Sequence, residues 1–254
     1  MCAMPKKHLR KNDRREMNLK KDDHGELHMK GTLYGVGVGP GDPELITLKA
    51  IRTIRNAKVI ACPGKDALQS AAYKIASRAV PELKEKELLA VPMPMTKDPE
   101  ELAKAHRNGA ARIEAVLDSG RDLAFLTLGD PSIYSTFTYL RRIVQEDGYP
   151  TCTVSGVPSF CAAAAALQIP LAEWDEELHI IPAAQEKELP LSYPGSYVLM
   201  KSGTQTGRIK ALLKDSGKTA YLAENCGMPE ETLCKGLSEF PDTAGYFSLV
   251  IVKD

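Results

Sequence analysis

Apolar runs of five to seven residues alternate with stretches of helical periodicity along the first part of the chain. The runs are typical of buried strands and cover residues 32–38, 58–62, 87–92, 122–128 and 151–155. Between them, the spacing of apolar positions predicts helices over residues 43–57, 67–80, 99–120 and 136–148. Strands that are apolar throughout and separated by helices indicate a parallel sheet covered on both faces.

The pattern changes after residue 155. It predicts an alanine-rich helix over residues 160–168 and one further clear helix over 206–217. Five strand candidates accompany them, at residues 178–182, 196–200, 218–223, 232–236 and 246–252. We therefore expect two α/β domains with a cleft between them, at residues 31–153 and 154–254. The first sheet should be mostly parallel and the second mixed.

Residues 1–30 differ from the rest of the chain. They hold nine Lys or Arg and five Asp or Glu but few apolar side chains, so they have little surface to bury. We expect a disordered, solvated tail. A basic arm that binds RNA is the alternative, and the interspersed acidic residues and missing aromatic residues disfavour it.

Composition and charge exclude several classes of protein. The 254 residues carry 33 Lys and Arg against 33 Asp and Glu, so no overall field favours nucleic acid or a membrane as partner. The six cysteines form no CxxC pair, and no apolar run approaches the roughly 20 residues that span a bilayer. We expect a soluble, reduced, cytoplasmic protein.

The stretch YGVGVGPGD, residues 34–42, places four glycines directly after the start of a strand. A nicotinamide cofactor would need a third glycine where Pro40 stands, and an acidic residue where the next strand ends in Ala61 and Cys62. A nucleoside triphosphate is also disfavoured. The sequence Gly217-Lys218-Thr219 lacks the required earlier glycine and leads into a strand, whereas a phosphate loop leads into a helix.

A second bare loop, LGDPSIYS at residues 128–135, also follows a predicted strand. Ligands of open α/β sheets bind at the carboxyl ends of the strands, where glycine lets the backbone approach them closely. Both loops could therefore serve one ligand. Each loop alone is equally compatible with a simple tight turn.

Five stretches in order resemble the tetrapyrrole methylases, which are S-adenosylmethionine-dependent enzymes of two α/β domains. The stretches are GVGVGPGDPELIT, LTLGDPSIYST, VSGVPSFCAAAA, SYVLMK and YFSLVIV, and the resemblance covers residues 31–254. Within the family, VPMPMT at residues 91–96 and the YFSLVIV stretch are most similar to the branch that methylates C-20 of precorrin-2 or cobalt-factor II. The resemblance also implies a homodimer.

The same resemblance implies which residues form the site. Asp42 faces the substrate, and Gly39 and Gly41 lie on the substrate side. The residues expected to hold S-adenosylmethionine are Pro40, Leu128, Gly129, Asp130, Ile133, Pro158, Ser159, Phe160, Met200, Cys226, Phe247 and Ser248. Two of these depart from the family pattern, since Pro158 replaces a hydroxyl side chain of many relatives and Cys226 replaces the glycine of some.

A carbon that accepts a methyl group must then lose its proton, so one general base is expected. Asp42 is the first candidate and Tyr134 the second. Alternatively, Asp42 is only the N-cap of a helix that begins at Pro43.

The acetate and propionate groups of a tetrapyrrole call for cationic partners. Lys201 and Arg208 are the main candidates, with Lys65 and Lys210 in similar loops; each could instead be an ordinary surface charge. His106 and His179 lack partners at metal-ligand spacing, so we expect no protein-bound metal.

We therefore predict S-adenosylmethionine-dependent methyl transfer to C-20 of precorrin-2 or cobalt-factor II, in cobalamin biosynthesis. One alternative is another methyltransferase of the same fold, acting on a different corrinoid carbon, uroporphyrinogen, diphthine or ribosomal-RNA ribose. The other is a module that binds a tetrapyrrole or adenosyl ligand without catalysis.

Overall fold

The computed structural model describes residues 19–21, 27–94, 96–183 and 191–254. They form two compact units. The first comprises the described residues up to Val38 together with Ile46–Gly156, and the second comprises Gly39–Leu45 and Val157–Asp254.

The division of the chain differs from the expected one at the glycine-rich loop. The expectation placed residues 39–45 in the first domain, whereas the structure groups them with the second unit. The reason is local packing, because the backbone of Gly41 and Asp42 lies directly against the backbone of Cys226 and Gly227. Further along, the first unit ends at Gly156, three residues after the expected boundary at residue 153.

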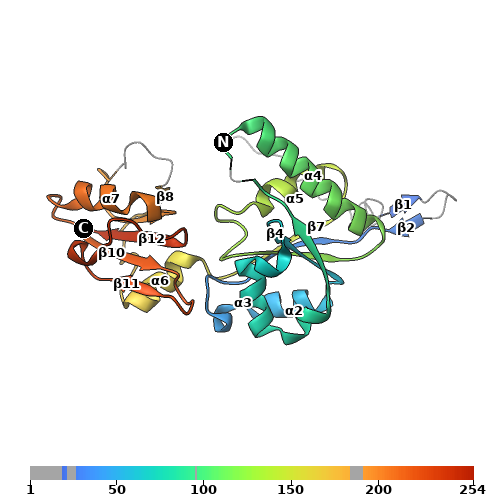
Figure 1. Cartoon of the computed structure of the whole chain (residues 1–254), viewed down its shortest axis with the longest axis horizontal. Coiled ribbons are helices and arrows are strands. Elements are labelled where there is room, and N and C mark those ends of the chain that lie inside the picture. Colours follow the sequence, from blue (N-terminus) through green and yellow to red (C-terminus); the bar gives the residue numbers. More distant parts are fainter. Residues whose placement is uncertain (1–18, 22–26, 95, 184–190) are drawn as a thin grey trace, which may run out of the picture. The chain divides into compact units, whose positions relative to one another are not determined.

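The sheet of the first unit has five parallel strands in the order β5-β4-β6-β3-β7, as expected for apolar strands alternating with helices. Helices α4 and α5 cover one face, and α2 and α3 cover the other (Figure 1). The elements are β3 (Leu33–Gly37), α2 (Leu48–Asn56), β4 (Val59–Pro63), α3 (Ala71–Ala79), β5 (Glu87–Val91), α4 (Pro99–Asp118), β6 (Leu123–Thr127), α5 (Phe137–Glu146) and β7 (Thr151–Val154).

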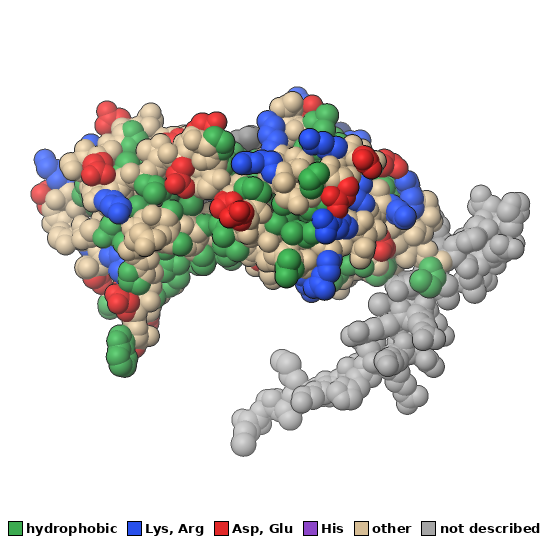
Figure 2. Space-filling view, turned by 90° about the horizontal axis from the view of Figure 1, so that it is seen from below, with side chains coloured by type: hydrophobic (Ala, Val, Ile, Leu, Met, Phe, Trp, Pro, Cys, Tyr) green, Lys and Arg blue, Asp and Glu red, His purple; other side chains and the backbone are tan. Residues whose placement is uncertain are grey.

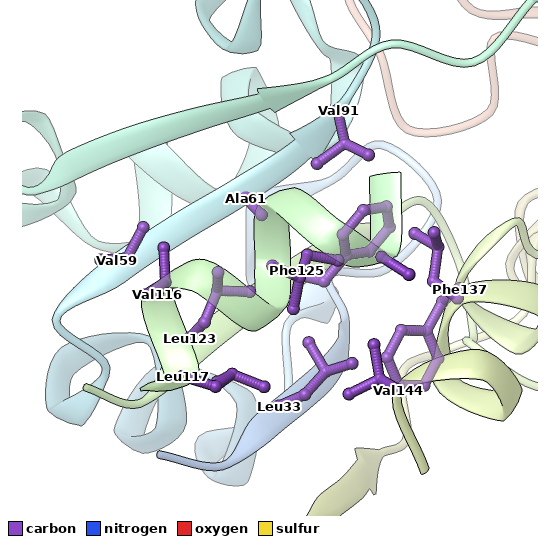
Figure 3. Close-up of a cluster of buried hydrophobic side chains, with 13 residues drawn as sticks. Leu33, Val59, Ala61, Val91, Val116, Leu117, Leu123, Phe125, Phe137 and Val144 are labelled. Carbon is purple, nitrogen blue, oxygen red and sulfur yellow. The ribbon is translucent and has the colours of Figure 1, made fainter. Parts of the chain in front are cut away.

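A hydrophobic core fills the space between this sheet and helices α4 and α5 (Figure 3). Phe125 of β6 and Phe137 of α5 are fully buried in it, with ring centroids 6.0 Å apart. Gly35 of β3 has a packing role here, because a Cβ at this position would lie 2.1 Å from the Phe137 ring. This glycine of the YGVGVGPGD stretch is therefore required by the core.

The sheet of the second unit also has five strands, in the order β11-β10-β12-β9-β8, and only β8 and β9 pair in parallel. The predicted mixed sheet is confirmed. Helices α6 and α7 lie on its two faces (Figure 1). The elements are α6 (Ser159–Leu167), β8 (Leu178–Pro182), β9 (Ser196–Met200), α7 (Thr206–Leu213), β10 (Thr219–Glu224), β11 (Thr232–Cys234) and β12 (Ser248–Lys253).

The helix predicted over residues 43–57 is wrong at its beginning. Residues Pro43–Leu45 form a separate 3-10 turn, η1, and α2 starts only at Leu48. Thr47 is the N-cap of α2 because its hydroxyl accepts a hydrogen bond from the Ala50 amide at 3.1 Å. The helix predicted over 67–80 divides in the same way, into a 3-10 turn at Ala67–Gln69 and α3.

The expected tail is corrected in part. Leu19–Lys21 and Leu27–Met29 form a short antiparallel pair of strands, β1 and β2, whereas the sequence predicted disorder throughout residues 1–30. The rest of that prediction falls on residues 1–18 and 22–26, which lie outside the described residues.

Charges of both signs occur side by side on the surface. On the face shown in Figure 2, acidic and basic side chains are interspersed. In the described ranges, no helix is long and apolar enough to cross a membrane.

A buried carboxyl group in the first unit gives the fold a pH dependence. Glu114 of α4 forms an ion pair with Arg107 at 2.7 Å, and Arg107 also binds Asp147 after α5. Burial, followed by the neighbouring Asp147 carboxylate, raises the pKa of Glu114. The bond from Arg107 lowers the pKa of Asp147. The contribution of Glu114 to stability is therefore present at low pH and lost as the pH rises through its folded-state pKa.

We expect Glu114→Gln to raise the melting temperature at pH 8 by roughly 2–4 °C, which corresponds to about 1 kcal/mol in a chain of this size. The amide keeps the shape of the side chain without the buried charge. At pH 4 the gain should vanish, because Glu114 is then protonated in the parent protein. Calorimetric scans at both pH values measure this, with Glu146→Gln as an exposed control. An equal effect at both pH values would contradict the account.

Candidate functional site

The carboxyl-terminal edge of the first sheet is built from three glycines, Gly37, Gly129 and Gly156, which we call the glycine triad. They follow or end strands β3, β6 and β7. A Cβ at Gly156 would lie 2.2 Å from the Gly129 carbonyl oxygen, and one at Gly37 would lie 2.5 Å from it. Gly129 itself has φ 68°, in the left-handed region that glycine adopts without strain. The edge therefore consists of closely packed backbone.

Asp130 fastens the loop after β6 to the segment after β7. One of its carboxylate oxygens accepts hydrogen bonds from the amide and hydroxyl of Ser132, and the other accepts from the Gly156 amide at 3.0 Å. The residue is only 8% exposed. Its charge is thus used within the loop, which holds Gly129 and the half-buried Leu128 and Ile133 in place.

Tyr134 follows in the same loop with φ 46°, a conformation that costs a bulky side chain energy. Its neighbour Ser135 is anchored, because its hydroxyl lies 2.8 Å from the Thr127 hydroxyl and accepts a hydrogen bond from the Phe137 amide. The Tyr134 side chain is 47% exposed. A strained aromatic residue displayed by an anchored loop is a common feature of functional sites.

One edge of the second sheet brings together four predicted site residues. Strand β12 runs antiparallel to β9 and β10, so its first residues lie beside the last residues of those strands. Met200 pairs with Leu249, and Ser248 pairs with Glu224. The segments Cys226 and Phe247–Ser248 are joined there, because the Asn225 amide donates to the Phe247 carbonyl at 2.9 Å.

The turn at residues 225–228 follows β10 and packs against the glycine-rich loop of residues 39–42, which we call the GPGD loop. Asn225 and Gly227 have φ 51° and 75°. A Cβ at Gly41 would lie 2.2 Å from the Cys226 carbonyl oxygen, and one at Gly227 would lie 2.5 Å from the Asp42 nitrogen. The two segments are therefore in backbone contact.

Asp42 caps the 3-10 turn η1. One oxygen of its half-buried carboxylate accepts a hydrogen bond from the Glu44 amide at 2.8 Å. Within the described part of the chain, its second oxygen has no protein partner. Asp42 is thus a cap, as the sequence suggested, but it caps η1 and not a long helix. The second carboxylate oxygen remains available to a ligand.

Sequence reasoning missed two carboxylates at this edge. Glu231 accepts a hydrogen bond from the Gly227 amide at 2.7 Å, and Glu224 accepts one from the Gly245 amide at 2.6 Å. For Glu231 the only signal in the sequence is its position four residues after a glycine that follows a strand, and that spacing is too common to single it out. Glu224 has no local signal, because its partner Gly245 is 21 residues away along the chain.

The remaining predicted cofactor residues lie at the start of α6. Pro158 precedes the helix in an extended conformation, and Ser159 is its first residue. The Phe160 side chain is 6% exposed and belongs to the interior of the unit. At this point the chain can thus offer the half-buried Pro158 and Ser159 to a ligand, but little of the Phe160 ring.

The candidate cations occupy different settings. Lys201 is exposed directly after β9 with φ 56°, and Arg208 is half-buried within α7. Lys210 donates to the Phe240 carbonyl at 3.2 Å, whereas Lys65 is exposed after β4. Among the residues that the structure describes, no group of three His, Cys, Asp or Glu side chains could hold a metal ion.

The arrangement is suited to binding a ligand through backbone groups rather than to forming a covalent bond with it. Burial, followed by the neighbouring Glu231, raises the pKa of the Cys226 thiol to about 12, so this thiol stays protonated near neutral pH. In the second unit, Gly41 and Gly227 let the GPGD loop and the turn at residues 225–228 pack backbone against backbone, so that main-chain groups dominate this edge. These features fit a nucleoside or amino-acid moiety bound by polar main-chain groups.

A sequence model of the family described as Tetrapyrrole (Corrin/Porphyrin) Methylases matches residues 32–240. Among curated proteins, the chain is 35% identical over 225 residues to the probable cobalt-precorrin-2 C(20)-methyltransferase of Methanocaldococcus jannaschii, covering 87% of this chain and 95% of that protein. It is 33% identical over 234 residues to the cobalt-precorrin-2 C(20)-methyltransferase of Salmonella typhimurium, covering 88% and 97%.

A third relative, the precorrin-2 C(20)-methyltransferase of a Sinorhizobium species, is 30% identical over 238 residues, covering 87% of this chain and 95% of that protein. Among solved structures, the uroporphyrin-III-C-methyltransferase of Thermus thermophilus superposes with a TM-score of 0.64 at 25% identity. That superposition covers 89% of this chain and 93% of the other. The predicted fold of two α/β sheets is confirmed.

Proposed function

The chain belongs to the tetrapyrrole methylases, and we propose that it transfers a methyl group from S-adenosylmethionine to C-20 of precorrin-2 or cobalt-precorrin-2 in cobalamin biosynthesis. One observation carries the proposal. Three relatives named for this reaction match nearly the whole of their own length to this chain, at 30–35% identity. The cofactor is S-adenosylmethionine.

The residues of the second unit fit the adenosyl part of this cofactor. Met200, Cys226, Phe247 and Ser248 gather at one edge of the sheet, and Cys226 can offer its backbone there. The family resemblance assigns the methionine part to the loop after β6, through the backbone around Gly129. Asp130 serves this loop from within, because both of its oxygens are engaged by Ser132 and Gly156.

S-adenosylmethionine supplies an activated methyl group when bound. The protein is left to align the accepting carbon and to remove one proton. We propose that Asp42 is the general base and accepts this proton on one carboxylate oxygen. Its other oxygen accepts a hydrogen bond from the Glu44 amide. In this proposal, Gly39 and Gly41 contact the tetrapyrrole next to Asp42. Lys201 and Arg208 bind the carboxylates of the tetrapyrrole.

Asp42→Asn is expected to lower kcat for the tetrapyrrole by about 10²–10⁴, the usual contribution of a general base. The free energy of unfolding should stay within about 0.5 kcal/mol, since Asn caps as well as Asp. Steady-state kinetics and urea unfolding measure both quantities. Asp66→Asn is the matched control, because Asp66 caps the 3-10 turn at Ala67–Gln69 through the Leu68 amide in the same manner.

Full turnover by Asp42→Asn would leave this residue as a cap alone and would transfer the proton to Tyr134. In that case Tyr134→Phe, which keeps the ring and removes the hydroxyl, is the variant expected to lose turnover.

We also propose that the protein works in the cytoplasm as a homodimer. The five described cysteines are all free thiols, in keeping with a reducing compartment, and the dimer follows the family resemblance. Light scattering is expected to give twice the mass of the chain, and the mass of one chain would contradict this.

Incubation with S-adenosylmethionine labelled at the methyl group tests the proposed function. The label should appear in the macrocycle with precorrin-2 or with its cobalt form. Binding of S-adenosylhomocysteine without any transfer to either macrocycle would instead indicate a non-catalytic binding module.

A further inference from the structure

The turn at residues 225–228 is fastened by one side chain, Glu231. Its carboxylate accepts a hydrogen bond from the Gly227 amide at 2.7 Å. The same carboxylate is a neighbour of the Cys226 thiol, whose pKa is raised first by burial and then by Glu231. Two consecutive residues of the turn thus interact with one carboxylate.

The turn needs such a fastening because its backbone is not regular. Asn225 and Gly227 both have positive φ, so the backbone of the turn departs from the extended conformation of the strand before it. Two hydrogen bonds close it from within, from the Met228 amide to the Asn225 carbonyl at 2.8 Å and from the Glu231 amide to the Met228 carbonyl at 3.1 Å.

Other parts of the site depend on where this turn lies. The Cys226 carbonyl sets how closely Gly41 can approach, and Gly227 lies against the Asp42 amide. The Asn225 amide donates a hydrogen bond to the Phe247 carbonyl. A shift of the turn would therefore move the GPGD loop and the start of β12 together.

We propose that Glu231 is a positioning residue for the cofactor, which fixes the turn at residues 225–228 and through it the GPGD loop and Phe247. The proposal rests on the proposed function, because it takes S-adenosylmethionine as the ligand of this edge. Glu231 touches no ligand itself; it acts through Cys226 and Gly227.

The chain contains a close internal match for this arrangement. Glu239 accepts a hydrogen bond from the Lys235 amide at 2.8 Å, again four residues earlier, and a cysteine, Cys234, again precedes that amide. That segment follows β11, the outermost strand of the sheet on its side, and contains no predicted site residue. Glu239→Ala therefore removes the same kind of bond and the same charge away from the site.

The experiment compares Glu231→Ala, Glu231→Gln, Glu239→Ala and Glu230→Ala in the full chain. S-adenosylhomocysteine is titrated into each by calorimetry, and the KM for S-adenosylmethionine and kcat are measured. Glu231→Ala should weaken binding and raise KM by about ten- to a hundredfold, as removal of groups that orient a ligand's contacts does. Because the GPGD loop carries Asp42 and moves with the turn, kcat should fall as well. Glu231→Gln should recover most of the affinity, since its amide oxygen still accepts the Gly227 amide.

The controls separate positioning from loss of stability. Glu239→Ala should lower the melting temperature as much as Glu231→Ala does but leave binding unchanged. Glu230→Ala, whose side chain has no partner in the described residues, should change neither. Equal binding by Glu231→Ala and the parent, equal weakening by Glu239→Ala, or no recovery by Glu231→Gln would each overturn the proposal.

Binding of S-adenosylhomocysteine by the parent protein tests the proposed function and not the role of Glu231. If the parent does not bind S-adenosylhomocysteine at all, the proposed function fails. If the parent binds it and Glu231→Ala binds equally well, the proposed function stands and only the role of Glu231 is refuted.

Discussion

Replacement of Gly156 by alanine is expected to destabilise the first unit by about 1–3 kcal/mol and to abolish binding of S-adenosylhomocysteine. The new Cβ would lie 2.2 Å from the Gly129 carbonyl oxygen and 2.8 Å from the Gly37 carbonyl carbon. Both neighbours are backbone atoms, so no side chain can rotate away. The strands must separate, and the bond from the Gly156 amide to Asp130 is strained with them. Urea unfolding and calorimetric titration measure the two effects.

Gly236→Ala is the control for this variant. No heavy atom lies within 4 Å of a Cβ at that position, so stability and binding should both match the parent protein. If Gly156→Ala matches the parent protein in stability and affinity, the three glycines of the triad need not pack closely. Ligand binding by the loop after β6 would then not require this packing.

Gly41→Ala is expected to lower kcat/KM by about a hundredfold, the loss that a displacement of about 1 Å at a reacting centre can produce. Its Cβ would lie 2.2 Å from the Cys226 carbonyl oxygen and would push the GPGD loop off the turn at residues 225–228. Asp42 follows directly and would move with it. Steady-state kinetics with the tetrapyrrole measures the loss.

The matched control is Gly195→Ala, which creates a similar backbone clash, 2.4 Å from the Glu177 carbonyl oxygen. Gly195 precedes β9, at the end of the strand opposite Met200. Because Gly195 also has φ 115°, which a side chain rarely adopts, this variant should lose at least as much stability, but it should keep kcat/KM once it is folded. A comparable loss of kcat/KM in both variants would assign the effect of Gly41→Ala to general destabilisation.

The sequence predicts the bounds of two strands of the second unit. Strand β9, at residues 196–200, is a buried apolar run, which has few other solutions. Strand β8, at residues 178–182, is only partly buried, and its bounds also agree with the prediction. The helix over 43–57 was less well predicted, since the apolar spacing is the same whether Asp42 caps a long helix or a short 3-10 turn. Only the Thr47 cap separates the two, and it depends on local geometry.

The candidate site was predictable as a set of loops but not as a set of contacts. The motifs that resemble the family place Met200, Cys226 and Phe247 at strand ends, and strand pairing brings them to one edge. The partner of Asp130 was not predictable, because Gly156 is 26 residues away along the chain. The role of Glu231 was hidden for a similar reason, since it depends on the fold of the turn.

The position of the new methyl group is the most direct test of methylation at C-20. The parent protein is incubated with S-adenosylmethionine carrying a ¹³C-labelled methyl group and, in separate reactions, with precorrin-2 and cobalt-precorrin-2. Mass spectrometry counts the methyl groups added, and NMR of the purified product locates them. One added methyl group, at C-20, is expected with at least one of the two macrocycles. A label at any other carbon, or no label in either product while S-adenosylhomocysteine binds, would contradict this expectation.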